Sequence, residues 1–193
     1  MRFRSHIDGS LHMLTPERAV DIQAQLGSDI MMALDHLIGL PAKPRKMLDA
    51  TLRTHRWLDR CIAALAESYG HARGVLFGIC QGGMDPDLRR LSAQYVAAAD
   101  VSGIAIGGLS VGETKAEMAE MLDVVVPELP EGKPRYLMGV GSPGRPLERS
   151  GARRRHVRLR PADPVGAQRF GLHTRRAHRS PSSEPSGIVR ANR

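Results

Sequence analysis

The chain has 193 residues, of which 41% are hydrophobic, and it carries a formal net charge of +8. That length and composition suit one globular domain, whereas a closed (β/α)8 barrel needs about 250 residues. No run approaches the ~20 apolar positions of a membrane span, and the first residues contain no apolar signal-peptide core, so we expect a cytoplasmic protein without membrane contact.

Four apolar segments predict buried parallel strands, and segments with helical spacing alternate with them. In chain order we predict a helix at 15–26, a strand at 29–35, a helix at 45–67, a strand at 74–80, a helix at 85–99, a strand at 103–106, a helix at 113–125 and a strand at 135–140. Nearly continuous apolar runs are typical of strands buried on both faces, and their alternation with helices indicates an α/β fold. Because only four strand–helix units are visible, we predict a partial (β/α)8 TIM barrel.

The chain divides near residue 144. Residues 145–193 contain 13 Arg, no Lys and three acidic residues, whereas residues 1–144 contain 15 Lys and Arg and 17 Asp and Glu. The basic excess therefore lies entirely in the last segment, where apolar residues follow neither a strand nor a helix period. We predict a partial barrel domain at 1–144 and an Arg-rich, disordered tail at 145–193, for which an RNA-binding arm is an alternative interpretation.

Potential metal ligands form no clear set in this sequence. Cys61 and Cys80 lie outside any CxxC motif or Cys/His cluster. We expect both to be reduced, buried thiols that act as small hydrophobic side chains. His6 and His12 flank Asp8 and belong either to a metal or catalytic cluster or to a hydrogen-bonded loop.

Candidate ligand-binding residues follow the predicted strands, at the end where an α/β barrel builds its site. Asp35 offers two acceptors to the N–H groups of a heterocycle, or else serves as a cap or ion-pair partner. Gln81 offers a donor and an acceptor to a base edge, although the glycines after it also fit a turn without function. Gly107-Gly108 followed by Leu109 either presents backbone N–H and C=O groups to a ligand or forms only a turn, and Met138 either covers a ring or packs in the core. Together they predict a site for a planar, hydrogen-bonding ring.

Five segments, taken together, resemble one enzyme family. They are FRSHIDGS at 3–10, LTPERAVDIQAQLGSDIMMALD at 14–35, LFGICQGG at 76–83, IAIGGLSVGE at 104–113 and KPRYLMGVGSP at 133–143. Their order and spacing closely resemble the tRNA-guanine transglycosylases, also called queuine tRNA-ribosyltransferases. The resemblance implies a homodimeric (β/α)8 barrel that contains zinc and acts as a pentosyltransferase in queuosine biosynthesis.

The resemblance also implies a reaction and its substrates. Guanine at the wobble position of tRNAs with a GUN anticodon (those for Asp, Asn, His and Tyr) is exchanged for preQ1 or queuine. An aspartate attacks the ribose anomeric carbon, guanine leaves, and the new base displaces the enzyme from a covalent intermediate.

Roles in base binding are implied residue by residue. Asp35 resembles the aspartate that binds the N–H edge of the purine, while Gln81 and the Gly108 N–H resemble the groups that contact its carbonyl. The Leu109 carbonyl resembles the one that meets the 7-substituent, and Met138 resembles the methionine that packs on the base.

Two positions near these residues bear on the choice of base. Val111 stands where the bacterial type has valine and the queuine-using type has glycine, which favours preQ1. Leu37 departs from the bacterial pattern, which often has cysteine two residues after the aspartate.

The catalytic parts of the family are not found in this reading frame. The general acid/base aspartate belongs to a TDSGGFQ-like motif upstream of the first residue, while the nucleophilic aspartate, a CxCxxC cluster and a later histidine are expected after Gly144. We therefore expect no catalytic residue, no zinc ligand and no exchange activity in this chain. The alternative is a non-catalytic tRNA-binding or partner subunit, although such a subunit is expected to keep its zinc cluster.

The tail is compatible with the missing nucleophile segment in another frame. Residues 156–174, HVRLRPADPVGAQRFGLHT, have an allowed codon choice that reads MFDCVLPTRSGRNGLAFT after a shift of one nucleotide. MFDCVLPTR resembles the catalytic segment of the family, and its aspartate codon overlaps the codon of Arg158. We therefore infer a frameshift near codons 144–145, with the nucleophilic aspartate expected at position 158.

Overall fold

The computed structural model describes residues 1–68 and 74–140, so the tail at 145–193, which includes Arg158, lies outside the described residues. The described part begins with β1 (Arg2–Arg4), β2 (Leu11–Met13), α1 (Pro16–Gln25), β3 (Ile30–Met32) and α2 (Pro44–Ser68). It continues with β4 (Val75–Cys80), α3 (Pro86–Ala98), β5 (Gly103–Ile106), α4 (Lys115–Val125), the 3-10 helix η1 (Val126–Glu128) and β6 (Arg135–Leu137).

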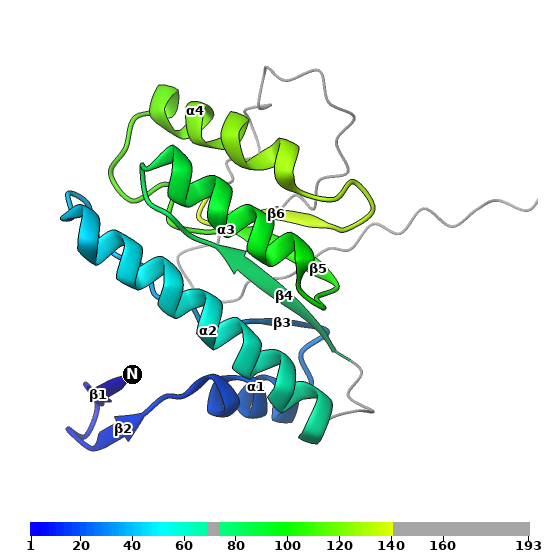
Figure 1. Cartoon of the computed structure of the whole chain (residues 1–193). Coiled ribbons are helices and arrows are strands. Elements are labelled where there is room, and N and C mark those ends of the chain that lie inside the picture. Colours follow the sequence, from blue (N-terminus) through cyan, green and yellow to red (C-terminus); the bar gives the residue numbers. More distant parts are fainter. Residues whose placement is uncertain (69–73, 141–193) are drawn as a thin grey trace, which may run out of the picture.

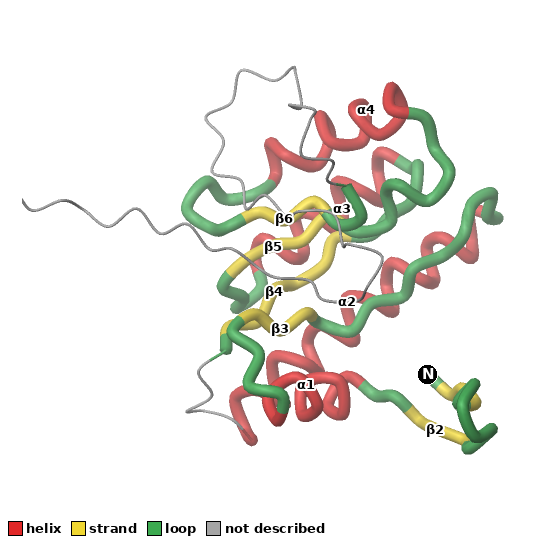
Figure 2. Tube along the Cα trace, turned by 180° about the vertical axis from the view of Figure 1, so that it is seen from behind, coloured by secondary structure: helices red, strands yellow, loops and turns green. Residues whose placement is uncertain are grey.

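Four parallel strands in the order β3-β4-β5-β6 form the central sheet. Neighbouring strands pair in register, as between Met31 and Leu76 and between Ile106 and Leu137. Helices α2, α3 and α4 cover one face of the sheet (Figure 1), and Figure 2 shows the same layers from behind. Helix α1 packs against α2 and β3. The sheet is therefore singly wound, which confirms the predicted α/β class with parallel strands.

The predicted helices are confirmed, and three of them begin at caps that the sequence encodes. The Thr15 side chain accepts the Arg18 N–H at 3.2 Å before α1, and the Asp85 side chain accepts two backbone N–H groups at the start of α3. Thr114 and Glu117 form a capping box, so α4 begins two residues later than predicted.

The strand predicted at 29–35 is shorter in the structure, where β3 ends at Met32. Beyond it, the Leu34 N–H donates to Cys61 Sγ at 3.5 Å and the His36 N–H donates to Thr54 Oγ1 at 3.0 Å. The Ala33 N–H still donates to the Phe77 carbonyl of β4 at 3.0 Å, but side chains of α2 accept from Leu34 and His36, so the backbone leaves the sheet there.

Two further differences concern short elements. Strand β6 ends at Leu137, three residues before the predicted end, and Gly139 then turns the chain with a φ of +72°. The antiparallel β1–β2 hairpin was not predicted, because its strands are only three residues long, too short for a strand period to be recognised, and every residue in them is exposed.

The core lies between the sheet and its helices. Its most deeply buried hydrophobic residues include Val20, Met31, Leu58, Cys61, Cys80, Val96, Ile104 and Val125. Both cysteines are unpaired and buried, as predicted, and burial raises the pKa of Cys80 to about 12. Among the helices that the structure describes, none has the length and apolarity that crossing a membrane requires.

Candidate functional site

The carboxyl ends of β3, β4, β5 and β6 bring most of the predicted ligand-binding residues together. Gln81 follows β4 and is almost fully buried, and its Nε2 donates to Asp35 Oδ2 at 2.5 Å. Asp35 is partly buried. Burial raises the pKa of the Asp35 carboxyl, and the hydrogen bond from Gln81 partly opposes that rise. The structure therefore places a carboxylate and an amide side by side at the sheet edge.

The Gln81 side chain lies directly against the two glycines that follow β5. A Cβ atom added to Gly107 would lie 2.8 Å from Gln81 Nε2 and 3.5 Å from Met138 Sδ, and one added to Gly108 would collide with Gln81 Oε1. Gly108 also has a φ of +66°, which side chains rarely adopt. Asp35, Gln81, Gly107, Gly108 and Met138 thus form one group, called the strand-end cluster below.

The loop that follows Gly108 is held by a carboxylate. Glu113 accepts hydrogen bonds from the backbone N–H groups of Ser110 and Val111, the second at 2.9 Å. Burial raises the pKa of Glu113, but the hydrogen bonds from these two N–H groups outweigh it and the net shift is downward. Ser110 has a positive φ of 65° within this loop, a backbone conformation that the two hydrogen bonds to Glu113 hold in place.

The Leu109 side chain is buried in the core, so only its backbone is available to a ligand. The Leu109 carbonyl lies 3.8 Å from the position that a Cβ of Gly139 would take, which places it beside the turn after β6. Val111 and Leu37, the two positions that bear on the choice of base, are exposed.

Arg89 on α3 was not identified from the sequence, although it is the most heavily bonded side chain behind the strand-end cluster. Its side chain is fully buried and donates from Nε to the Gly83 carbonyl at 2.7 Å, from Nη1 to the Gly107 carbonyl at 2.6 Å and from Nη2 to the Gly108 carbonyl at 2.8 Å. Burial lowers the pKa of Arg89 to about 10, so it is still charged at neutral pH.

The sequence does contain one indication that Arg89 is buried, namely its position in the helical repeat of α3. It shares the buried face of α3 with Ser92, Ala93 and Val96, at the spacing of an apolar stripe. An arginine in such a stripe requires several acceptors nearby, which identifies it as a structural or functional residue.

A second buried network supports Gln81 from behind. The Gln81 N–H donates to Ser92 Oγ at 3.0 Å, and Ser92 Oγ lies 3.1 Å from His55 Nε2. The His55 ring stacks on Tyr95 with centroids 4.1 Å apart, and Tyr95 donates its hydroxyl hydrogen to Asp59. Burial lowers the pKa of His55, so the ring is neutral at pH 7. This network fixes the backbone from which the Gln81 amide projects.

The segment between His6 and His12 forms a hydrogen-bonded loop. Ser10 Oγ donates to Asp8 Oδ1 at 2.8 Å and lies 2.7 Å from His12 Nε2, and the His12 ring stacks on Phe3. Within residues 1–68 and 74–140, no three His, Cys, Asp or Glu side chains are arranged to hold a metal ion. Of the two interpretations of this segment, the structure supports the loop.

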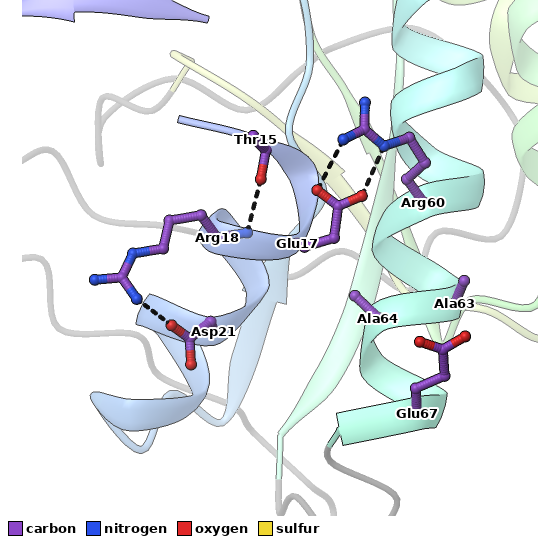
Figure 3. Close-up of a pocket in the computed structure, with 8 residues that line it drawn as sticks. All are labelled: Thr15, Glu17, Arg18, Asp21, Arg60, Ala63, Ala64 and Glu67. Carbon is purple, nitrogen blue, oxygen red and sulfur yellow. Dashed lines mark hydrogen bonds and ion pairs between the residues drawn. The ribbon is translucent and has the colours of Figure 1, made fainter. Parts of the chain in front are cut away.

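A cavity of about 560 Å³ lies between α1 and α2 and shares no lining residue with the strand-end cluster. Figure 3 shows the side chains around it. It is lined by Thr15, Glu17, Arg18, Asp21, Arg60, Ala63, Ala64 and Glu67. Arg60 donates two hydrogen bonds to the Glu17 carboxylate, at 2.7 and 2.8 Å, which lowers the pKa of Glu17 to about 2. This ion pair ties α1 to α2 on the exposed side of the two helices.

Comparison with known proteins gives one family for this arrangement. The family model described as queuine tRNA-ribosyltransferase matches residues 1–149. A queuine tRNA-ribosyltransferase of Herpetosiphon aurantiacus is 56% identical over 146 residues, which are 76% of this chain and 36% of that protein. Those of Pelotomaculum thermopropionicum and Agrobacterium fabrum are 55% and 50% identical over 141 residues, 73% of this chain and 37% of each protein.

The chain thus has a parallel α/β sheet with a polar cluster at its strand ends, and its sequence is closely similar to queuine tRNA-ribosyltransferases. The chain belongs to the queuine tRNA-ribosyltransferase family, as its motifs predicted. It spans little more than a third of the length of the curated relatives it matches.

Proposed function

We propose that this chain is the base-binding part of a tRNA-guanine transglycosylase, a pentosyltransferase that exchanges guanine at the wobble position of tRNAs with a GUN anticodon. The observation that carries the proposal is the contact of Asp35 with Gln81 beside Gly107 and Gly108. A carboxylate next to an amide matches the edge of guanine, which presents N–H donors next to a carbonyl acceptor. The names of the relatives support the same reaction.

Each member of the strand-end cluster has a distinct role in this proposal. The Asp35 carboxylate accepts the N–H groups of the base, and Gln81 Nε2 turns from Asp35 to the base carbonyl. The Gly108 N–H donates to the same carbonyl. Met138, whose sulfur lies near Gly107, covers one face of the ring. Base binding therefore replaces the internal contact between Asp35 and Gln81 with contacts to the ligand.

The loop after β5 supports preQ1 as the incoming base. Because a peptide bond is trans and planar, the donation of the Ser110 N–H to Glu113 turns the Leu109 carbonyl to the opposite side. There the carbonyl accepts a hydrogen bond from the aminomethyl group of preQ1. Val111 is a valine and adds bulk beside this group, so queuine is expected to bind more weakly than preQ1.

The remaining features of the whole protein are proposals from the resemblance. The sequential strand order with helices on one face supports a complete (β/α)8 barrel in the longer relatives. The described residues do not fit the zinc of the family, since they hold no cluster of three suitable ligands. A homodimer, a cytoplasmic location and a zinc site outside these residues are expected of the full-length enzyme.

The proposal is tested by the binding of guanine and preQ1 to the 193-residue chain in a calorimeter. We expect both bases to bind, and Asp35→Asn to weaken binding at least about ten-fold, since one of the two acceptor oxygens becomes an NH2 group that donates and would face an N–H of the base. Asp123→Asn is the matched control, because Asp123 is an exposed residue of α4. Absence of binding, or equal affinities for the two variants, would contradict the proposal.

A further inference from the structure

One buried guanidinium binds two separate loops of the site. The first loop follows β4 and provides the Gly83 carbonyl, and the second follows β5 and provides the carbonyls of Gly107 and Gly108. All three distances from Arg89 lie between 2.6 and 2.8 Å. The planar fork of an arginine offers several N–H donors in fixed directions, and here it joins the two loops rigidly.

This clamp determines where the neighbouring amides point. In a trans peptide the N–H is directed opposite to the carbonyl of the same unit. Because the Gly107 carbonyl points at Arg89, the Gly108 N–H points away from α3. The Gly108 carbonyl is also held by Arg89, so the Leu109 N–H is turned the same way. Neither of these two N–H groups donates a hydrogen bond within residues 1–68 and 74–140.

Neighbouring contacts prevent the Gly107–Gly108 backbone from rotating to point its amides elsewhere. Gln81 lies against the Gly107–Gly108 backbone on one side, and the Gly107 N–H is held by the Cys80 carbonyl at 3.0 Å. The Arg89 main chain also packs under Gly82, where an added Cβ would lie 2.7 Å from the Arg89 nitrogen. Arg89 is thus the contact that selects the direction of the Gly108 N–H.

We propose that Arg89 is a positioning residue for base selection, whose three hydrogen bonds present the Gly108 N–H to the carbonyl of the bound base. It does not touch the ligand. The proposal rests on the proposed function, since it assigns a role in the binding of the same base. Lysine cannot replace it, because a single ammonium group does not reach three carbonyls in fixed directions.

The test compares Arg89→Lys with Arg90→Lys in the full chain. Arg90 is the matched control, because it is half-exposed on the same helix and forms ion pairs with the carboxylates of Asp87 and Glu128. We expect Arg90→Lys to bind guanine as the unchanged chain does, and Arg89→Lys to keep its fold while binding about ten-fold more weakly, the equivalent of one hydrogen bond. A folded Arg89→Lys variant with unchanged affinity for guanine would overturn the proposal.

If Arg89→Lys does not fold, a second measurement, made on the unchanged chain, tests whether Arg89 positions the Gly108 N–H. In a ¹⁵N,¹³C-labelled sample, the Arg89 N–H groups are expected to show couplings across hydrogen bonds to the Gly107 and Gly108 carbonyl carbons. Added guanine is expected to shift the Gly108 amide resonance. Guanine binding without that shift overturns the role of Arg89 alone, whereas no guanine binding to the unchanged chain contradicts the proposed function itself.

Discussion

Arg89→Met is the substitution whose effect on stability follows most directly from the structure. Methionine keeps much of the length of the side chain but donates no hydrogen bond, so three carbonyls that now bind Arg89 lose their donors. Each buried carbonyl left without a donor costs about 1 kcal/mol or more, while removal of the buried charge recovers part of this. We expect the free energy of unfolding to fall by about 3–5 kcal/mol.

Urea unfolding followed by circular dichroism measures this loss. With a slope of about 2 kcal/mol per molar urea, the midpoint is expected to fall by about 2 M. Arg90→Met is the control, since it removes only half-exposed ion pairs with Asp87 and Glu128 and is expected to cost less than about 1 kcal/mol. If the free energy of unfolding of Arg89→Met lies within about 1 kcal/mol of that of the unchanged chain, the view that Arg89 holds the two loops together is refuted.

Four further predictions follow from the site and from the tail. Incubation of the chain with labelled guanine and a GUN-anticodon tRNA is expected to give no incorporation above background, because no nucleophilic aspartate stands at position 158; measurable exchange would contradict this. Gly107→Ala is expected to weaken guanine binding in calorimetry at least about ten-fold, because the added methyl group displaces the Gln81 amide, whereas Gly132→Ala, whose added methyl group would meet no atom of the described residues within 4 Å, serves as control. Burial raises the folded-state pKa of Asp35, so the protonated carboxyl contributes stability below the unfolded pKa of about 3.9, and this contribution is lost as pH rises through the folded-state pKa. In urea titrations from pH 3 to 8, the unchanged chain is therefore expected to lose stability relative to Asp35→Asn as pH rises. Guanine binding needs the ionised carboxylate, so it is expected to weaken as pH falls through the same window. Resequencing of the gene across codons 130–180 is expected to show a one-nucleotide change near codon 144 that restores MFDCVLPTR, and an unchanged frame would refute the inferred frameshift.

The sequence predicted the elements whose signals are local. Helices α1, α3 and α4 carry their own caps, and β4 and β5 are apolar runs buried within the sheet, so their limits were found to within two residues. The end of β3 could not be found in this way, because it depends on Cys61 and Thr54, which belong to a helix that follows later in the chain.

The sequence predicted the candidate residues that would meet a ligand, but not the buried residues that hold them in place. Asp35, Gln81 and the glycines after β5 end apolar runs, and that position is visible in a sequence. Arg89 and Ser92 lie in the middle of a helix, and their partners are backbone groups of distant loops. Such contacts depend on the packing of α3 against the sheet, which no local pattern specifies.

The two glycine loops are tied to α3 as well as to each other. Strands β4 and β5 already join through the hydrogen bond from the Gly107 N–H to the Cys80 carbonyl, and the Arg89 guanidinium adds a rigid link from both loops to the helix. A substitution at the exposed Val111 or Leu37 leaves this link untouched, whereas a change in the packing of α3 would move both loops. Under the proposed function, a helix that never meets the base therefore sets where the carbonyl of the base is received.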